Sequence, residues 1–445
     1  MKLPEKGPDF KTALHKNPGL LNEIILSHEV QEILKKAKEE YWPWEEFKYK
    51  VQNQKFSPEN LWCYMKFFRS FSLNRLPFSD AYGQLFGFRL FDKLHEDLHY
   101  IDQTFGGGFL LEGADHLPEA KERYIVGSLM EEAIASSQIE GAATTRRVAK
   151  EMLRKNLKPQ DQSQQMIVNN YKAILGIKDT LDEPMSISLL HRFHRMITEN
   201  TLDDPTAAGR FRKEDEPIQV MDQEDGQVLH TPPPFDNLPE SLQKLCDFAN
   251  SKQDLFFIHP VIKAVILHFW LAYLHPYVDG NGRTARALFY WYMLKQKYWL
   301  FEYLSISRII LKSRKQYNRA FLHSELDDAD LTYFIVYHLR AIQLAIRELQ
   351  DYLKRKQRDY RESLRLLKKA SWMNYRQQAL IQHALKHPDF IYTIESHKNS
   401  HNVTYQTART DLLSLAKKEC LEKIKSGRAF QFAVPADLPK KVGLY

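Results

Sequence analysis

The sequence predicts a mainly helical protein, and two observations carry that prediction. Apolar residues recur at spacings of three and four over most of the 445 residues, as they do on the buried face of a helix. Alternating apolar and polar residues beside turn residues occur in two short segments, which predicts small β-hairpins there. With 43% hydrophobic residues, the chain can bury sizeable cores.

The pattern divides the chain into four parts. The pattern predicts a helical N-terminal region at residues 1–115, whose role the sequence does not indicate. Trp42-Pro43-Trp44 marks a break between two helices of this region. Residues 116–349 predict a helical core, 350–372 a basic helical linker, and 373–445 a separate small domain. Helices are expected at 20–35, 85–98, 128–137, 161–183, 187–198, 239–250, 260–274, 282–297, 308–322, 331–349, 374–385, 392–398 and 403–415.

One turn of the core carries chemistry-bearing residues at close spacing, in the segment 275–286, HPYVDGNGRTAR. Gly280 and Gly282 allow the backbone to bend and to approach a ligand without a Cβ in the way. A helix that resumes near Gly282 would direct its unpaired N–H groups into this turn, which favours an anion. A Gly-Asn-Gly turn by itself is usually only a loop, so the side chains around it determine whether the turn is interpreted as a binding site.

Those side chains are a base, a carboxylate and two guanidinium groups. Arg283 and Arg286 are three residues apart, hence neighbours on one helix face, and together can bind charged oxygens. Asp279 can hold a divalent cation, and His275 exchanges protons near neutral pH. A polyphosphate, a metal ion and a proton acceptor in one window indicate nucleotide chemistry.

This segment resembles the signature of the Fic family, His-x-Phe-x-Asp/Glu-Gly-Asn-Gly-Arg-x-x-Arg. Every defined position matches except that Tyr277 stands where phenylalanine is usual, which affects local packing rather than the chemistry. The approach from Ile258 to Phe269 also resembles the helix that precedes the signature in the family. The resemblance implies a helical core and the transfer of AMP from ATP to a hydroxyl side chain of a protein.

The resemblance also implies a role for each residue of the signature. His275 would take the proton from a Ser, Thr or Tyr hydroxyl of the target, which attacks the α-phosphorus of ATP, and Asp279 would hold Mg²⁺. Arg283 would steady the β- and γ-phosphate oxygens and Arg286 the γ-phosphate, and pyrophosphate would leave. The residues expected to bind the nucleotide are Gly280, Asn281, Gly282, Arg283 and Arg286.

A second segment, Ser136 to Gly141, resembles the inhibitory motif of the family, Ser/Thr-x-x-x-Glu-Gly/Asn. Ser136 and Glu140 are four residues apart, so on a helix both point the same way. The resemblance implies that Glu140 pairs with Arg286 and so removes an arginine that would otherwise bind the γ-phosphate. An ordinary surface glutamate before a helix-ending glycine would have the same sequence.

A third segment predicts a β-hairpin. Two short apolar runs, 217–221 and 227–231, flank an acidic turn at 222–226, and three prolines follow. In the Fic family a hairpin called the flap holds the target segment by adding it as a strand. The residues expected to dock the target are Ile218, Gln219, Val220 and Met221.

The last part resembles a winged helix-turn-helix domain, a common C-terminal companion of Fic cores. Three predicted helices are followed by the alternating runs 421–424 and 429–434 around Ser426-Gly427. If this domain binds DNA, the third helix would present Thr404, Gln406, Thr407 and Arg409 to the major groove. Protein contact or dimerisation is an equally good interpretation.

Composition limits the remaining classes. Three distant cysteines, Cys63, Cys246 and Cys420, favour neither a disulfide framework nor a zinc site. The N-terminus lacks an apolar signal core, and polar residues interrupt the longest apolar tract, 255–277, so we expect a cytoplasmic protein without membrane contact. The net charge of +7 includes eight basic against three acidic residues in 351–370, which suits a solvated helix face or an acidic partner, including nucleic acid.

Two other functions remain open on the sequence. The same site could mainly remove AMP, with Glu140 orienting a water molecule. The chain could instead be a DNA-binding regulator whose Fic domain only senses a nucleotide. Phosphotransfer is disfavoured because related phosphorylating proteins depart from the Gly-Asn-Gly core, which is intact at Gly280–Gly282. Self-modification and a homodimer, both frequent in the family, also remain open.

Overall fold

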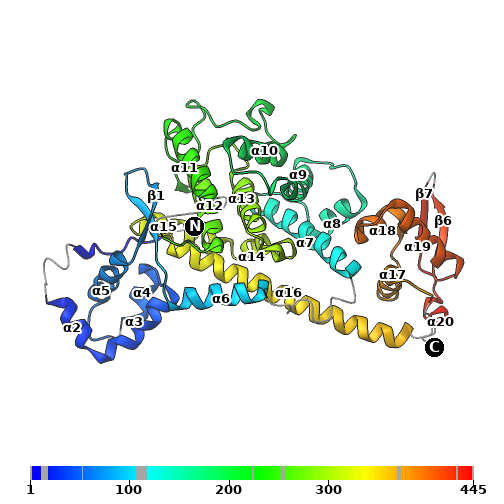
Figure 1. Cartoon of the computed structure of the whole chain (residues 1–445), viewed down its shortest axis with the longest axis horizontal. Coiled ribbons are helices and arrows are strands. Elements are labelled where there is room, and N and C mark those ends of the chain that lie inside the picture. Colours follow the sequence, from blue (N-terminus) through cyan, green and yellow to red (C-terminus); the bar gives the residue numbers. More distant parts are fainter. Residues whose placement is uncertain are drawn as a thin grey trace. The chain divides into compact units, whose positions relative to one another are not determined.

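The computed structural model is mainly helical with three small sheets in the part of the chain that it describes, as the sequence predicts (Figure 1). It describes residues 3–11, 19–52, 54–106, 118–222, 225–251, 256–367, 372–426 and 429–442. The chain forms two compact units. Unit 1 comprises Met1–Gln103, Lys172–Tyr298 and Ile309–Gln343, and unit 2 comprises Thr104–Tyr171, Trp299–Arg308 and Leu344–Tyr445.

The N-terminal helices of unit 1 pack around a core of their own. They are α2 (Leu20–Leu26), α3 (His28–Glu40), α4 (Trp44–Lys50) and α5 (Pro58–Phe71). Buried aromatic and aliphatic side chains join them, with Trp62, Phe47 and Leu34 almost completely covered. The predicted break is confirmed: α3 ends at Glu40, and α4 begins at Trp44 after Pro43, whose fixed φ suits a helix start.

The predicted helix at 85–98 is wrong in its first half. Strand β1 (Asn74–Ser79) pairs antiparallel with β2 (Leu85–Phe88), and α6 (Asp92–Gly106) begins only after this hairpin. Short apolar runs do not distinguish a strand from a helix, and here packing decides. The Phe86 ring lies 5.4 Å from that of Phe269, and Phe78 stacks on Trp270 at 4.5 Å.

The remaining helices of unit 1 surround a helix that is buried on nearly all sides. This helix, α12 (Pro260–Leu274), is apolar around its whole circumference, as expected of a central core helix. It packs closely against α13 (Asn281–Lys295) and α11 (Leu238–Asn250), and α13 also packs on α10 (Ile187–Thr198). The predictions of 187–198 and 260–274 agree with the observed bounds.

One predicted helix, 308–322, is divided in the structure. It is broken at Ser313 between α14 (Ile306–Lys312) and α15 (Arg314–Leu326). The following helix, α16 (Thr332–Leu367), is longer than predicted and contributes residues to both units. Short 3₁₀ helices occur at Lys178–Thr180, Pro205–Ala207, Phe235–Asn237 and Trp299–Tyr303.

Unit 2 contains a group of three helices and a C-terminal module. The helices α7 (Pro118–Ile139), α8 (Arg146–Lys155) and α9 (Gln162–Ile177, whose last residues belong to unit 1) share a small apolar core with Met130, Ile134, Met152 and Ile167. The module comprises α17 (Tyr375–Lys386), α18 (Ile394–His401), α19 (Tyr405–Lys417), α20 (Leu438–Lys441) and the strands β5 (Tyr392–Thr393), β6 (Glu422–Ser426) and β7 (Ala429–Ala433).

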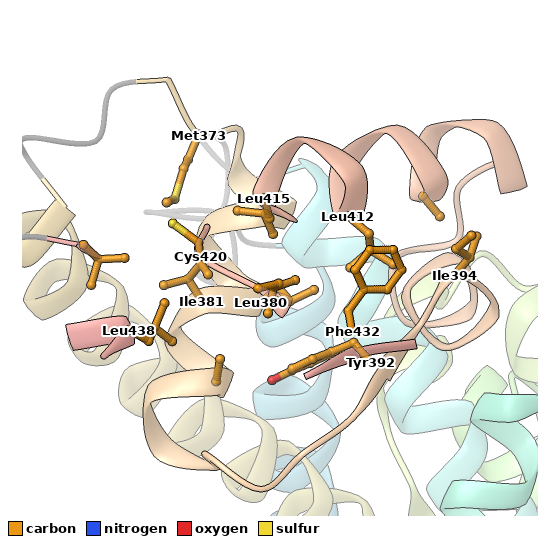
Figure 2. Close-up of a cluster of buried hydrophobic side chains, with 14 residues drawn as sticks. Met373, Leu380, Ile381, Tyr392, Ile394, Leu412, Leu415, Cys420, Phe432 and Leu438 are labelled. Atoms are coloured by element: carbon orange, nitrogen blue, oxygen red, sulfur yellow. The ribbon is translucent and has the colours of Figure 1, made fainter. Parts of the chain in front are cut away.

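The C-terminal module has three longer helices, the four-residue helix α20 and a sheet with the strand order β5-β7-β6. Leucines of α17 and α19 meet Tyr392 and Phe432 of the sheet in its core (Figure 2). The helix expected at 392–398 begins only at Ile394, because Tyr392 and Thr393 pair with β7 and the Thr393 hydroxyl caps the helix. The predicted sequence of three helices and a hairpin is otherwise confirmed.

Candidate active site

The candidate site begins at the turn between α12 and α13 in unit 1. His275 caps the C-terminal end of α12 in the left-handed conformation, with φ 46° and ψ 55°. Gly280 caps the start of α13 with φ 80°. A Cβ at Gly280 would lie 2.7 Å from Cγ2 of Thr198, so glycine is required for both conformation and space.

Asn281 closes this turn from within. Its side-chain oxygen accepts from the Tyr277 N–H at 2.9 Å, and its amide nitrogen donates to the Tyr277 carbonyl at 2.7 Å. Both polar atoms of the Asn281 side chain therefore bind the backbone of the turn, and in this position they stabilise the turn rather than contact a ligand. The groups that α13 presents at this end are its first backbone N–H groups, which suit an anion.

His194 on α10 stabilises the turn by connecting its main chain to Gly209. Its Nδ1 accepts from the Gly209 N–H at 2.9 Å, so its Nε2 carries the proton and donates to the Asp279 carbonyl at 2.8 Å. Burial lowers the pKa of His194 to about 4, against the opposing effect of the Asp279 carbonyl. This histidine is thus a neutral bridge with one fixed tautomer.

Tyr277 occupies the position where phenylalanine was expected from the family resemblance. Its ring is fully buried and stacks on the His194 ring at 3.8 Å with an interplanar angle of 5°. The hydroxyl lies 3.3 Å from Nδ1 of His191. The ring thus packs as an aromatic residue should, and the additional hydroxyl has a polar neighbour.

Asp279 and Arg283 form an ion pair at the start of α13. An Arg283 N–H donates to Oδ2 of Asp279 at 2.8 Å, and another donates to the Ile197 carbonyl at 3.3 Å. The Arg283 side chain is completely buried, whereas the Asp279 side chain is 55% exposed. Arg283 therefore orients the carboxylate from behind, and the carboxylate is the group that faces solvent.

The expected base, His275, is half-buried and held through its backbone and its ring. Its Nδ1 lies 3.1 Å from the Ala272 carbonyl, which can only accept, so the lone pair of the neutral ring is on Nε2. Arg212 fastens the main chain here: its Nε donates to the His275 carbonyl at 3.1 Å, and its backbone N–H donates to the Pro276 carbonyl at 2.8 Å.

The predicted hairpin is confirmed beside this turn. Strands β3 (Val220–Met221) and β4 (Val228–His230) pair antiparallel, with Val220 opposite His230 and an irregularity before the next pair. Met221 and Val228 are exposed apolar residues, 56% and 38%. Ile218 and Gln219 precede β3 rather than lying in it. Residues 223–224 of the expected acidic turn lie outside the described residues.

Neither a clustered metal site nor a membrane span is found in the described ranges. No group of three or more His, Cys, Asp or Glu side chains is placed there to hold a metal ion. A cation at Asp279 would thus need oxygen ligands from a bound substrate or from water, which is typical of Mg²⁺ with phosphates. Among the same residues, no helix has the length and apolar character to cross a bilayer.

Comparison with known proteins agrees with this geometry. The model of the Fic/DOC family matches residues 184–293, which contain α10, the hairpin, α12 and the turn. The chain carries a Fic/DOC family domain. Within it lie both histidines of the turn region, His194 and His275, and the two arginines of the signature.

Related sequences match about a quarter of this chain. Protein adenylyltransferase Fic of Nematostella vectensis is 32% identical over 120 residues, 26% of this chain and 25% of the relative. Protein adenylyltransferase fic-1 of Caenorhabditis elegans is 35% identical over 106 residues, 24% of this chain and 18% of the relative. The match therefore spans about a quarter or less of the length of these curated relatives.

The fold extends beyond the matched sequence. A crystal structure of a Fic family protein from Desulfovibrio desulfuricans superimposes with a TM-score of 0.51 and 18% identity, over 78% of this chain and 98% of the other. At this identity the likeness shows the fold alone. The helical Fic fold predicted from the sequence is thereby confirmed.

Outside the Fic domain, the segment expected to be inhibitory lies at the end of α7 in unit 2. Ser136 is buried in the last turn of the helix, and Glu140 follows directly after it, before Gly141 with φ 97°. A helix C-terminus carries partial negative charge, so a carboxylate at this end does not stabilise the helix. The neighbouring Ser137 hydroxyl donates to the Ala133 carbonyl at 2.9 Å.

The residues expected to contact DNA lie at the start of α19. Thr404 is its N-cap and accepts from the Thr407 N–H, so part of its side chain serves the helix itself. Thr404 and Gln406 are exposed, and Thr407 and Arg409 are partly covered. Their positions suit an accessible helix end, and DNA binding itself stays a prediction.

The sequence did not reveal the residues that hold the site together. His194 is one histidine in an amphipathic helix, Arg212 lies just before the predicted hairpin, and His230 lies in the second run of that hairpin. Each acts through backbone carbonyls that are distant in sequence. The spacing of residues in the sequence does not predict such contacts, because they depend on how several helices and strands pack together.

Proposed function

We propose that this Fic domain transfers AMP from ATP to a hydroxyl side chain of a protein. The observation that carries the proposal is the turn between α12 and α13. It places an imidazole, a solvent-facing carboxylate and the N-terminal end of a 15-residue helix within one short segment. The names of the related adenylyltransferases support the same reaction.

In the proposed reaction, Nε2 of His275 accepts the proton of the target hydroxyl. The hydroxyl oxygen forms a bond to the α-phosphorus of ATP, while the bond from that phosphorus to the bridging oxygen of the β-phosphate breaks. Pyrophosphate leaves with that oxygen and its electron pair. The catalytic contribution of the protein is mainly positioning and charge neutralisation, as in other phosphoryl and nucleotidyl transfers.

The geometry of the turn and the resemblance to the Fic family support an assignment of the phosphate-binding groups. The first N–H groups of α13, beginning at Asn281, would bind phosphate oxygens, and Arg286 would bind the γ-phosphate. Asp279 would hold Mg²⁺, which would neutralise phosphate charge there. Arg283, completely buried against Asp279, would act by orienting this carboxylate, in addition to its charge near the phosphates.

We also propose that Glu140 inhibits the reaction by pairing with Arg286, and that the flap residues Ile218 to Met221 dock the target as an added strand. The position of Glu140 at a helix C-terminus, where it does not stabilise α7, supports an inhibitory role. The exposed apolar residues of the hairpin support docking.

Parallel incubations with ATP labelled at the α- or the γ-phosphate test the proposed reaction. Protein-bound label from α-labelled ATP alone is the expected result, and retention of γ-label would instead indicate phosphotransfer. His275→Ala is expected to abolish incorporation while ATP still binds, because only the proton acceptor is removed. Undiminished incorporation by this variant would show that His275 is not the base.

The inhibitory role has its own test. Glu140→Gln keeps the shape of the side chain and removes its charge, and Glu140→Gly removes the side chain altogether. Both should increase self-labelling, whereas Glu151→Gln, at an exposed glutamate of α8, should leave it unchanged. Equal labelling by all these variants and the wild type would reject inhibition by Glu140. Release of AMP from a previously labelled protein would identify the reverse reaction.

A further inference from the structure

The flap is fastened to the core through one buried histidine. His230 lies on β4, directly opposite Val220 of β3, and its side chain is only 10% exposed. Its Nδ1 lies 2.8 Å from Oε2 of Glu325 on α15, and its Nε2 lies 2.8 Å from the Tyr273 carbonyl on α12. We call His230, Glu325 and the Tyr273 carbonyl the flap anchor.

The partners fix the charge of this histidine. A backbone carbonyl and an ionised carboxylate can only accept hydrogen bonds, so both ring nitrogens of His230 must donate, which makes the ring an imidazolium. Burial alone would lower the pKa of His230, but the hydrogen bond and charge of Glu325 and the Tyr273 carbonyl outweigh it, and the pKa is raised.

The position of the anchor links the flap to the proposed base. Tyr273 is two residues before His275, in the last turn of α12, where the partial negative charge of a helix end favours a cation. A second fastening lies nearby, because Arg212 donates to the carbonyls of both Pro233, three residues after His230, and His275. His230 thus donates to the Tyr273 carbonyl and Arg212 to the carbonyls of Pro233 and His275, so two cationic side chains hold the end of the flap and the main chain of His275.

We propose that His230 is a positioning residue, whose charged ring holds β3 at the distance from His275 that a docked target strand requires. The proposal rests on the proposed function, since the flap matters for catalysis only if a target docks there. His230 does not contact the reacting atoms. The groups that face it are Glu325 from α15 and Tyr273 from α12, whose ring centroid lies 4.8 Å away.

Because the pKa of His230 is raised on folding, the direction of the pH effect is fixed. The anchor stabilises the flap fully below the ordinary histidine pKa of 6.5, and this stabilisation is lost as the pH rises through the raised value. A histidine that was only a packing residue would give no such dependence.

Hydrogen exchange of flap amides in the full-length chain tests the anchor without reference to activity. Exchange of peptides covering 213–222 and 225–235 would be followed from pH 6 to 9 and corrected for intrinsic rates. Wild-type protection should fall about tenfold over this range, as expected for the loss of one charged hydrogen bond. His230→Gln should remove most of the protection already at pH 6, since a neutral amide cannot replace both donors.

Two further variants keep the test decisive if His230→Gln unfolds. Glu325→Gln should shift the pH at which protection is lost to a lower value, because the charge that raises the pKa of His230 is gone. His95→Gln, at an exposed histidine of α6, should behave as the wild type. Wild-type flap protection that does not vary with pH, or that is unchanged in Glu325→Gln, would overturn the proposal.

A kinetic measurement separates the anchor from the reaction itself. In the Glu140→Gly background, His230→Gln should slow self-labelling from α-labelled ATP about tenfold, with the KM for ATP unchanged. Labelling that is as fast as in the Glu140→Gly parent would overturn the positioning role. If flap exchange depends on pH as expected but no variant incorporates label, the anchor is confirmed and the proposed transfer reaction is wrong.

Discussion

The turn after α12 and the base of the flap are each held by a buried histidine, but His194 is neutral whereas His230 is positively charged. His194 receives one hydrogen bond from an N–H group and gives one to a carbonyl, and its pKa falls to about 4. His230 gives hydrogen bonds to a carbonyl and a carboxylate, and its pKa rises. Burial acts in the same direction on both, so the partners decide the charge state.

The difference fits the surroundings of the two histidines. Within the turn, the amide of Asn281 and the stacked rings of Tyr277 and His194 are neutral near neutral pH. The attachment of the flap depends on the ion pair between His230 and Glu325, and the strands of the flap expose apolar residues. We therefore infer that the proposed phosphate-binding turn is fixed, and we expect the attachment of the hairpin to respond to pH.

The largest effect on this comparison is expected from His194→Leu. The substitution leaves the Gly209 N–H and the Asp279 carbonyl without their partner in a buried place, which costs about 4 kcal/mol of folding free energy. Activity should fall at least about 100-fold, because the Asp279 main chain is no longer held. Urea unfolding and AMP incorporation from α-labelled ATP measure the two effects.

His95→Leu on the exposed face of α6 is the matched control and should change the unfolding free energy by less than about 0.5 kcal/mol. His194→Gln is the intermediate case, since its amide can still donate to the Asp279 carbonyl. Equal stabilities for His194→Leu and the wild type would mean that the neutral bridge does not hold the turn.

A smaller effect is expected from glycine substitutions in the same two regions. Gly280 and Gly226 both have positive φ, 80° and 69°, but only Gly280 has neighbours within 4 Å of an added Cβ. Gly226→Ala should therefore cost about 1 kcal/mol for its conformation alone. Gly280→Ala should cost about 3 kcal/mol because Thr198 must also move, and it should reduce labelling. Similar costs for both variants, measured by urea unfolding, would refute this distinction between a packed and an open turn.

The sequence predicted the parts of the site that lie close together in the chain. The signature from His275 to Arg286 and the bounds of α10 and α12 could be read from residue type and spacing, because local conformation and one buried helix explain them. The hairpin of the flap could also be predicted, since it is a local structure with turn residues.

The sequence could not predict what depends on packing between distant segments. The run at Leu85–Phe88 fits a helical spacing as well as a strand, and its rings reveal their place only against α12. The expectation that Arg283 faces the phosphates follows from helix spacing, whereas its burial against Asp279 and Ile197 depends on α10. His194 and His230 each have a main-chain carbonyl among their partners, and such a partner cannot be recognised from residue identity.

The smallest effect is expected from Tyr277→Phe, which removes the hydroxyl and keeps the ring on His194. The hydroxyl is 3.3 Å from Nδ1 of a half-buried His191 that can bind water instead, so the unfolding free energy should fall by less than about 1 kcal/mol. Labelling should stay within about twofold of the wild type. Tyr277→Leu, which loses the stacked ring, should cost clearly more, about 2–3 kcal/mol. If Tyr277→Phe were as damaging as Tyr277→Leu, the hydroxyl rather than the ring would hold the turn, and the neutral region would depend on a second polar contact through His191.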